Sequence, residues 1–212
     1  MKVVGIDLSG PVNFADTCLV SFEERSNEIQ LLDVHEGASD QQILEAIFSL
    51  GNKDRIVIGI DAPLSYNSTG GYRASDRELY ELIKEKGGGA GIMAPTMTKM
   101  VYLTLRGVAL TRLLESLQVD PGIVEVHPGA CMLLRGAEKE DVRKFKSDGQ
   151  ARKRLLNWLE DQGVKGIGGG ETNSDHYVAA CAVALGAWGW TLGKPAWCFT
   201  AIPPHHPYDF AC

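Results

Sequence analysis

The hydrophobic positions of this chain fall into short β-branched runs and longer stretches of helical spacing. Three short runs come first, at residues 3–6, 17–22 and 28–34, and Asp7 follows the first of them directly. A charged turn at 23–27 separates the second run from the third, which is typical of antiparallel neighbours. We therefore predict a three-stranded antiparallel meander at the start of the chain.

Helical patterns alternate with further strand patterns in the rest of the chain. Apolar runs at 55–61 and 122–127, the first ending in Asp61, predict two more buried strands, and 197–202 is a candidate for another. Two helices are predicted from capping boxes: one begins at 39–42, and the other runs from 75–78 to the glycines at 87–89. Apolar residues at helical spacing predict three more, over 97–117, at the end of 135–154, and over 175–191 with Ser174 as N-cap. Residues 166–170 are predicted to be a flexible linker.

The order of these elements predicts one α/β domain over residues 1–212, because this length fits one ordinary domain. Its mixed five-stranded sheet has the first three strands antiparallel and is flanked by helices. We expect a helical insertion around 73–118 and a C-terminal helix at 175–191.

Composition and charge leave this picture unchanged. The chain is 44% hydrophobic and 23% charged, close to an average globular protein, and its net charge of −6 argues against an overall basic nucleic-acid coat. Residues 135–154 nevertheless hold eight basic and four acidic residues. This segment either follows a nucleic-acid backbone or is a solvated helix face.

Location is the next expectation from the sequence. Asp7 interrupts the first apolar stretch, and the longest charge-free stretch, 177–193, falls short of the roughly 18 apolar residues of a membrane span. The five cysteines are scattered and lack a C-x-x-C pair, which favours a reducing compartment. We expect a cytoplasmic protein that does not enter the membrane.

Acidic residues end or interrupt three of the predicted strands. These are Asp7, Asp61 and Glu125, and Asp175 begins the last helix. Carboxylates that converge at one sheet edge repel one another and are costly to desolvate, unless a divalent cation neutralises them. The pattern therefore predicts Mg²⁺ or Mn²⁺ held by these four residues, with two ions catalysing phosphodiester hydrolysis.

Each acid also has an ordinary structural explanation. Asp7 and Asp61 suit turns after strands, and Asp175 suits the first turn of a helix. Glu125 is harder to explain in this way, because an unpaired acid inside a strand is expensive unless it faces solvent.

Several motifs in the same order resemble the family catalogued as domain of unknown function 429. They are residues 5–8 (GIDL), 59–64 (GIDAPL), Arg73 with 76–79 (DREL), Met93, Pro95, 125–128 (EVHP), and Asp175 followed by Ala179-Ala180. The residues after Asp175, His176-Tyr177-Val178, differ from the small residues frequent in that family. The resemblance implies an RNase H-like fold and a predicted nuclease activity on DNA or RNA, in a superfamily that also holds resolvases, transposases and ATPases.

Further residues are candidates for catalysis or substrate binding. His127 lies two positions after Glu125 and either orients water or the scissile phosphate, or packs or caps locally. Arg73 and Arg77 lie near the glycine-rich loop and, with Lys99, are candidate phosphate ligands. Arg77 also fits a solvated first turn. Arg106 is a weaker candidate of the same kind.

Two other functions remain open at this stage. No P-loop, nucleophile elbow or zinc-protease motif is present in the sequence. An RNase H-like phosphotransferase or ATPase normally uses a second such domain, which only a homodimer supplies here. A non-catalytic binding module has no evident reason to keep mutually repelling acids at its strand ends.

Overall fold

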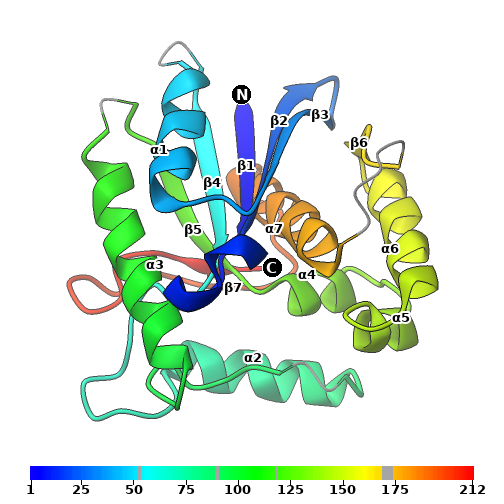
Figure 1. The fold of residues 1–212 in the computed structure, drawn as a ribbon. Helices are drawn as coiled ribbons and strands as arrows, with labels where there is room; N and C mark the ends of the chain where they lie inside the picture. The colour runs from blue at the N-terminus through cyan, green and yellow to red at the C-terminus, as the bar shows by residue number, and fades with distance from the viewer. Residues whose placement is uncertain (52–53, 89–90, 118, 169–173) are drawn as a thin grey trace.

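The fold is built on one mixed sheet of eight strands in the order β6-β3-β2-β1-β4-β5-β8-β7 (Figure 1). The computed structural model describes residues 1–212 except 52–53, 89–90, 118 and 169–173. The strands are β1 (Lys2–Asp7), β2 (Cys18–Arg25), β3 (Glu28–Glu36), β4 (Ile56–Asp61), β5 (Gly122–Val126), β6 (Val164–Lys165), β7 (Cys198–Phe199) and β8 (Phe210–Ala211). The helices are η1 (Pro11–Asp16), α1 (Asp40–Ser49), α2 (Ala74–Glu85), α3 (Met100–Glu115), α4 (Pro128–Leu134), α5 (Lys139–Lys144), α6 (Gly149–Asp161) and α7 (Asp175–Thr191).

The sheet confirms the predicted α/β class and the antiparallel meander. β1 pairs antiparallel with β2, and β2 pairs antiparallel with β3. β4 and β5 then add parallel to β1 in turn. The predicted number of five strands was too small, because the two-residue strands β6, β7 and β8 extend the sheet at its edges. Of the predicted strand at 197–202, only β7 forms.

Helices cover both faces of the sheet (Figure 1). α7 lies on one face and contacts β1 and β4 where these strands carry glycine: a Cβ on Gly5 would approach Ala180 O to 2.1 Å, and one on Gly59 would approach Val183 O to 2.9 Å. α1 and α3 pack on the opposite face, against Ile6 and Ile60. Alternate residues of each strand therefore face α7 or face α1 and α3.

Most helix boundaries follow the predicted signals, with two differences. Ser39 caps α1 in a capping box with Gln42, and Ser174 caps α7, both as predicted. α2 begins earlier than predicted, with Arg73 rather than Ser75 as its N-cap, because the Arg73 backbone N–H donates to Asp76 Oδ2. The sequence patterns also missed the short helices α4 and α5. The predicted linker at 166–170 lies partly outside the described residues.

Two features of the structure relate to the expected cytoplasmic location: the state of the cysteine thiols and the character of the helices. All five cysteine thiols are free. Among the described residues, no helix has both the length and the apolar character needed to cross a membrane.

Candidate functional site

Asp7 and Asp61 form a pair at the ends of two neighbouring strands. β1 and β4 are parallel, and their register places Asp7 directly beside Asp61. Because Gly5 and Gly59 face α7, the residues two positions later face the same side, beyond the first turn of that helix. The structure therefore brings these two predicted acids together.

A cavity of about 520 Å³ lies over this pair. Asp7 and Asp61 line it together with Asp175 and His176 from the start of α7. The rest of the wall comes from the segment between β1 and β2, from the residues after α2, from α3 and α4, and from α5 and the turn that follows it. Asp175 thus shares the cavity with the strand acids.

The local electrostatics of the pair are unusual for two aspartates. Burial, together with the adjacent Asp7 carboxylate, holds the pKa of Asp61 well above its ordinary value of 3.8. The other acid of the pair, Asp7, has a hydrogen-bond partner: its Oδ2 lies 2.7 Å from His176 Nδ1. This hydrogen bond raises the pKa of His176 above 6.5. The charged form of Asp61 is thus disfavoured unless positive charge is placed beside it.

Glu125 lies on the other face of the sheet. Its register partner in β4 is Ile60 and not Asp61, so its side chain points away from α7. Both carboxylate oxygens are occupied: Oε1 accepts from Arg73 Nη2, and Oε2 accepts from Arg73 Nη1 at 2.8 Å and from the Leu64 N–H at 2.9 Å. The structure does not add Glu125 to the Asp7–Asp61 pair as a free ligand, contrary to the predicted four-residue site.

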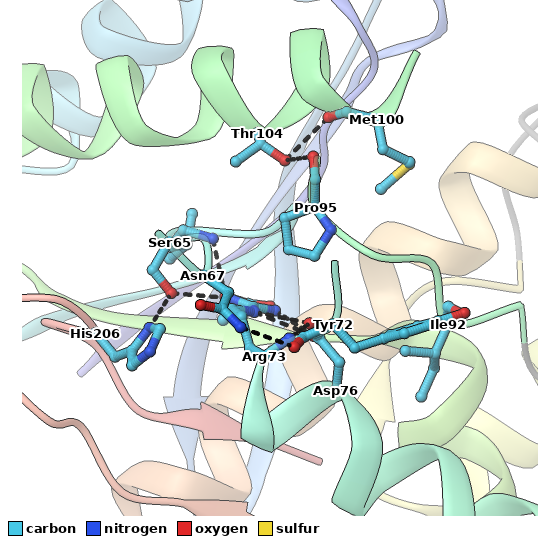
Figure 2. A network of polar contacts seen from close by, with 12 residues as sticks. Ser65, Asn67, Tyr72, Arg73, Asp76, Ile92, Pro95, Met100, Thr104 and His206 are labelled. Atoms are coloured by element: carbon cyan, nitrogen blue, oxygen red, sulfur yellow. Dashed lines mark hydrogen bonds and ion pairs between the residues drawn. The ribbon is translucent and has the colours of Figure 1, made fainter. Parts of the chain in front are cut away.

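Arg73 is enclosed by this same network and is not available to a phosphate. Its side chain is 3% exposed, and it also pairs with Asp76, which is 2% exposed. Figure 2 shows Arg73 between Asp76 and Ser65, with His206 beyond Ser65; Arg73 Nη1 donates to Ser65 Oγ at 3.1 Å, and His206 Nδ1 lies 2.8 Å from the same oxygen. Its predicted role as a phosphate ligand is replaced by a structural one.

The other predicted cations also lie away from the cavity. Arg77 and Lys99 are exposed, on α2 and just before α3 respectively, and neither lines the cavity wall. Arg106 is 7% exposed and pairs with Asp40.

His127 lines the cavity and also caps α4. Its Nδ1 accepts the Ala130 N–H at 3.0 Å, so the neutral ring carries its proton on Nε2. Burial and the nearby charge of Lys146 lower the pKa of His127 from 6.5 to about 4. The capping alternative is therefore realised, while the ring remains at the edge of the candidate site.

Sequence patterns did not single out His176, Lys139, Arg143 or Lys146, all of which line the cavity. His176 gave no separate signal, although its position after an acid at a helix start places it near the strand ends. Lys139, Arg143 and Lys146 were part of the basic segment 135–154 but were not distinguished within it. Only the tertiary position of α5 separates them from the other cations of that segment.

The donor set is smaller than the four carboxylates predicted. Within the described ranges, no group of three or more His, Cys, Asp or Glu residues is arranged to hold a metal ion. Asp7 and Asp61 are the two carboxylates that the sheet register itself places side by side.

The chain belongs to a family of unknown function: the model described as "Protein of unknown function (DUF429)" matches residues 5–205. This confirms the resemblance drawn from the motifs. Comparison with curated proteins and with solved structures gives no match.

Proposed function

We propose that this protein is a Mg²⁺- or Mn²⁺-dependent nuclease that hydrolyses phosphodiester bonds of DNA or RNA. The observation that carries the proposal is the in-register pair Asp7 and Asp61 at the floor of a cavity of about 520 Å³. The antiparallel first three strands and the flanking helices support an RNase H-like arrangement.

The residues present fit a hard divalent cation. Mg²⁺ is commonly held by one or two carboxylates, with water and substrate phosphate completing its shell. Asp7 and Asp61 would hold it, and the raised pKa of Asp61 indicates a carboxylate whose ionisation an added positive charge would favour. When bound, the cation supplies positive charge that stabilises phosphoryl oxygens and lowers the pKa of water.

Two histidines have separate tasks in this proposal. His176 holds Oδ2 of Asp7 and so fixes the orientation of that carboxylate, leaving Oδ1 for a ligand. His127 stays neutral at physiological pH and presents Nε2–H, which is a donor for a phosphate oxygen. Because its Nδ1 is occupied, we assign it to orient the phosphate and not to remove a proton.

The first test is a calorimetric titration with Mn²⁺ and with Mg²⁺. We expect the wild type to bind and Asp61→Asn to lose binding. Asp16→Asn is the matched control, because Asp16 is an exposed acid of the same cavity wall, and it should retain binding. Bound cation should also raise the melting temperature of the wild type.

A second step tests the reaction itself. Single-stranded, duplex and hybrid DNA and RNA are incubated with Mn²⁺, and cleavage should require the cation and be lost in Asp61→Asn. If the wild type binds neither cation, even with inorganic phosphate present, the proposal fails and the non-catalytic binding module becomes the better hypothesis.

A further inference from the structure

The cavity over the aspartate pair has a second, basic part. Lys139, Arg143 and Lys146 line it from α5 and the turn after that helix. Lys146 lies close enough to favour ionisation of Asp61, yet no ion pair within 4.0 Å joins the two side chains. The acidic and basic groups thus share one cavity without neutralising each other directly.

The three cations differ in whether they already have a partner. Arg143 makes two hydrogen bonds with Glu140, at 3.1 and 2.8 Å. Lys139 and Lys146 form no ion pair with any residue in the described part of the chain. These two ammonium groups are therefore available to an anionic ligand.

The rest of the lining and the size of the cavity limit the ligand. Apolar side chains, including Leu103, Leu133 and Phe145, contribute to the wall. A cavity of about 520 Å³ is in the range that encloses one ligand of drug size, so it takes an unpaired nucleotide but does not enclose a duplex. The apolar groups suit a base or sugar, and the lysines suit a phosphate.

We propose that the substrate is an unpaired nucleic-acid strand whose flanking phosphate is bound by Lys139 and Lys146 while the phosphate to be cleaved lies at Asp7 and Asp61. This inference rests on the proposed function and specifies its substrate class. Two phosphates in succession are needed to engage both parts of the cavity. A strand supplies them in every pair of adjacent nucleotides.

Binding of a fluorescein-labelled oligothymidylate of about ten nucleotides, followed by anisotropy in EDTA and again with Ca²⁺, tests the inference. We expect the double variant Lys139→Gln/Lys146→Gln to bind at least about tenfold more weakly. The slope of log affinity against log salt should become shallower by about 0.7, since the contact to one phosphate of a single strand is lost. Lys144→Gln is the matched control, because Lys144 lies on the same helix but pairs with Glu140 and does not line the cavity.

Other outcomes overturn the inference. If the double variant binds the oligonucleotide as the wild type and Lys144→Gln do, the lysines do not hold the strand. A duplex of the same length that binds equally well, with the same lysine dependence, contradicts the unpaired substrate. ADP that displaces the oligonucleotide completely assigns the cavity to a free nucleotide instead.

These results are separable from the test of the proposed function. Mn²⁺-dependent cleavage with unchanged affinity in the lysine variant would overturn the inference and leave the nuclease proposal standing. Lysine-dependent binding with no cleavage under any Mn²⁺ condition would overturn the nuclease proposal and leave the binding of an unpaired strand by the two lysines standing. The wild type, the double variant and Lys144→Gln are compared by thermal melting, and the exposed positions of these lysines predict unchanged stability.

Discussion

Asp7 and Asp61 are held side by side and partly buried, an arrangement that costs folding free energy. The raised pKa of Asp61 expresses that cost, because its ionised form loses hydration and meets a like charge. An asparagine has nearly the same shape and no charge. The carboxylate of Asp61 should therefore favour cation binding while it lowers the stability of the cation-free protein.

We predict that Asp61→Asn stabilises the cation-free protein while abolishing Mn²⁺ binding. In EDTA at neutral pH, the free energy of unfolding should rise by about 1–2 kcal/mol. Urea denaturation measures this change, with Asp16→Asn as an exposed control expected within about 0.5 kcal/mol of wild type. A clear loss of stability in Asp61→Asn would show that the pair is not under electrostatic strain.

His127 predicts a pH dependence of stability. Burial lowers its pKa from 6.5 to about 4, so the unfolded chain binds a proton in this interval that the folded chain does not. The stabilisation is complete above pH 6.5 and is lost as the pH falls towards 4, by at most about 3 kcal/mol. His127→Asn keeps an N-cap residue but does not titrate. Chemical denaturation of both proteins between pH 7 and 4 should give a steeper loss for the wild type, and parallel curves would contradict the assignment.

Which acids form the site could be predicted only in part from the sequence. Asp7 and Asp61 each follow a β-branched run directly, and parallel pairing then places them together. Glu125 fits the same description, but it pairs with Ile60, the residue before Asp61. Its side chain therefore lies on the opposite face of the sheet. Relative register is a property of the assembled sheet and leaves no trace in the separate strand patterns.

At the scale of elements, the approach of α7 to β1 and β4 sets the position of the candidate site. Gly5 and Gly59 permit this close contact, and the helix then begins near the ends of both strands. The site therefore depends on two strand positions that carry no side chain.

We predict that Gly5→Ala severely destabilises the protein. The new Cβ would lie 2.1 Å from Ala180 O and 2.7 Å from Ala184 N, both backbone atoms of α7, so the helix itself must move. We expect a loss of about 3 kcal/mol or more, or no folded protein. Gly122→Ala is the matched control in β5, since its Cβ would meet Trp190 at an ordinary 3.5 Å. Equal melting temperatures for the two variants would contradict this account of the packing.

The elements themselves were predictable where pattern and length coincided. The five central strands coincide with short runs rich in β-branched residues and α7 with a long apolar stretch, and the caps Ser39 and Ser174 have the preferred side chains. The strands β6 and β8 have two residues each, too few to show a periodicity, and β7 forms only two residues of the strand predicted at 197–202. α2 begins earlier than predicted because the side chain of Arg73, a residue type that is unfavourable as an N-cap, is held in place by ion pairs with Glu125 and Asp76.

At the scale of the whole molecule, the Arg73 network joins segments that are distant in the chain. It connects the start of α2 to Glu125 in β5, to Ser65 after β4, and through Ser65 to His206 near the C-terminus (Figure 2). The Arg73 guanidinium also lies 5.5 Å from the centre of the Phe210 ring in β8. Removing one partner from such a buried network leaves an uncompensated charge, which commonly costs about 3–5 kcal/mol.

We predict that Glu125→Gln lowers stability strongly and leaves Mn²⁺ affinity unchanged. The substitution keeps the shape of the side chain but leaves Asp76 as the one charged partner of Arg73 among the described residues. We expect the free energy of unfolding to fall by about 2–4 kcal/mol, measured by urea denaturation. Arg143→Gln, which breaks an exposed pair with Glu140, should change it by less than about 1 kcal/mol.

Glu125→Gln and Asp61→Asn together separate the two roles that carboxylates have in this fold. Asp61→Asn, on the α7 face, should remove cation binding and raise the free energy of unfolding. Glu125→Gln, on the opposite face, should lower the free energy of unfolding and leave cation binding intact. Calorimetric titration of the folded Glu125→Gln protein with Mn²⁺ decides the point, because a ligand lost from the cation site lowers the affinity even where the fold survives. Loss of Mn²⁺ binding in that protein would return Glu125 to the cation site and require β5 to pair in a different register.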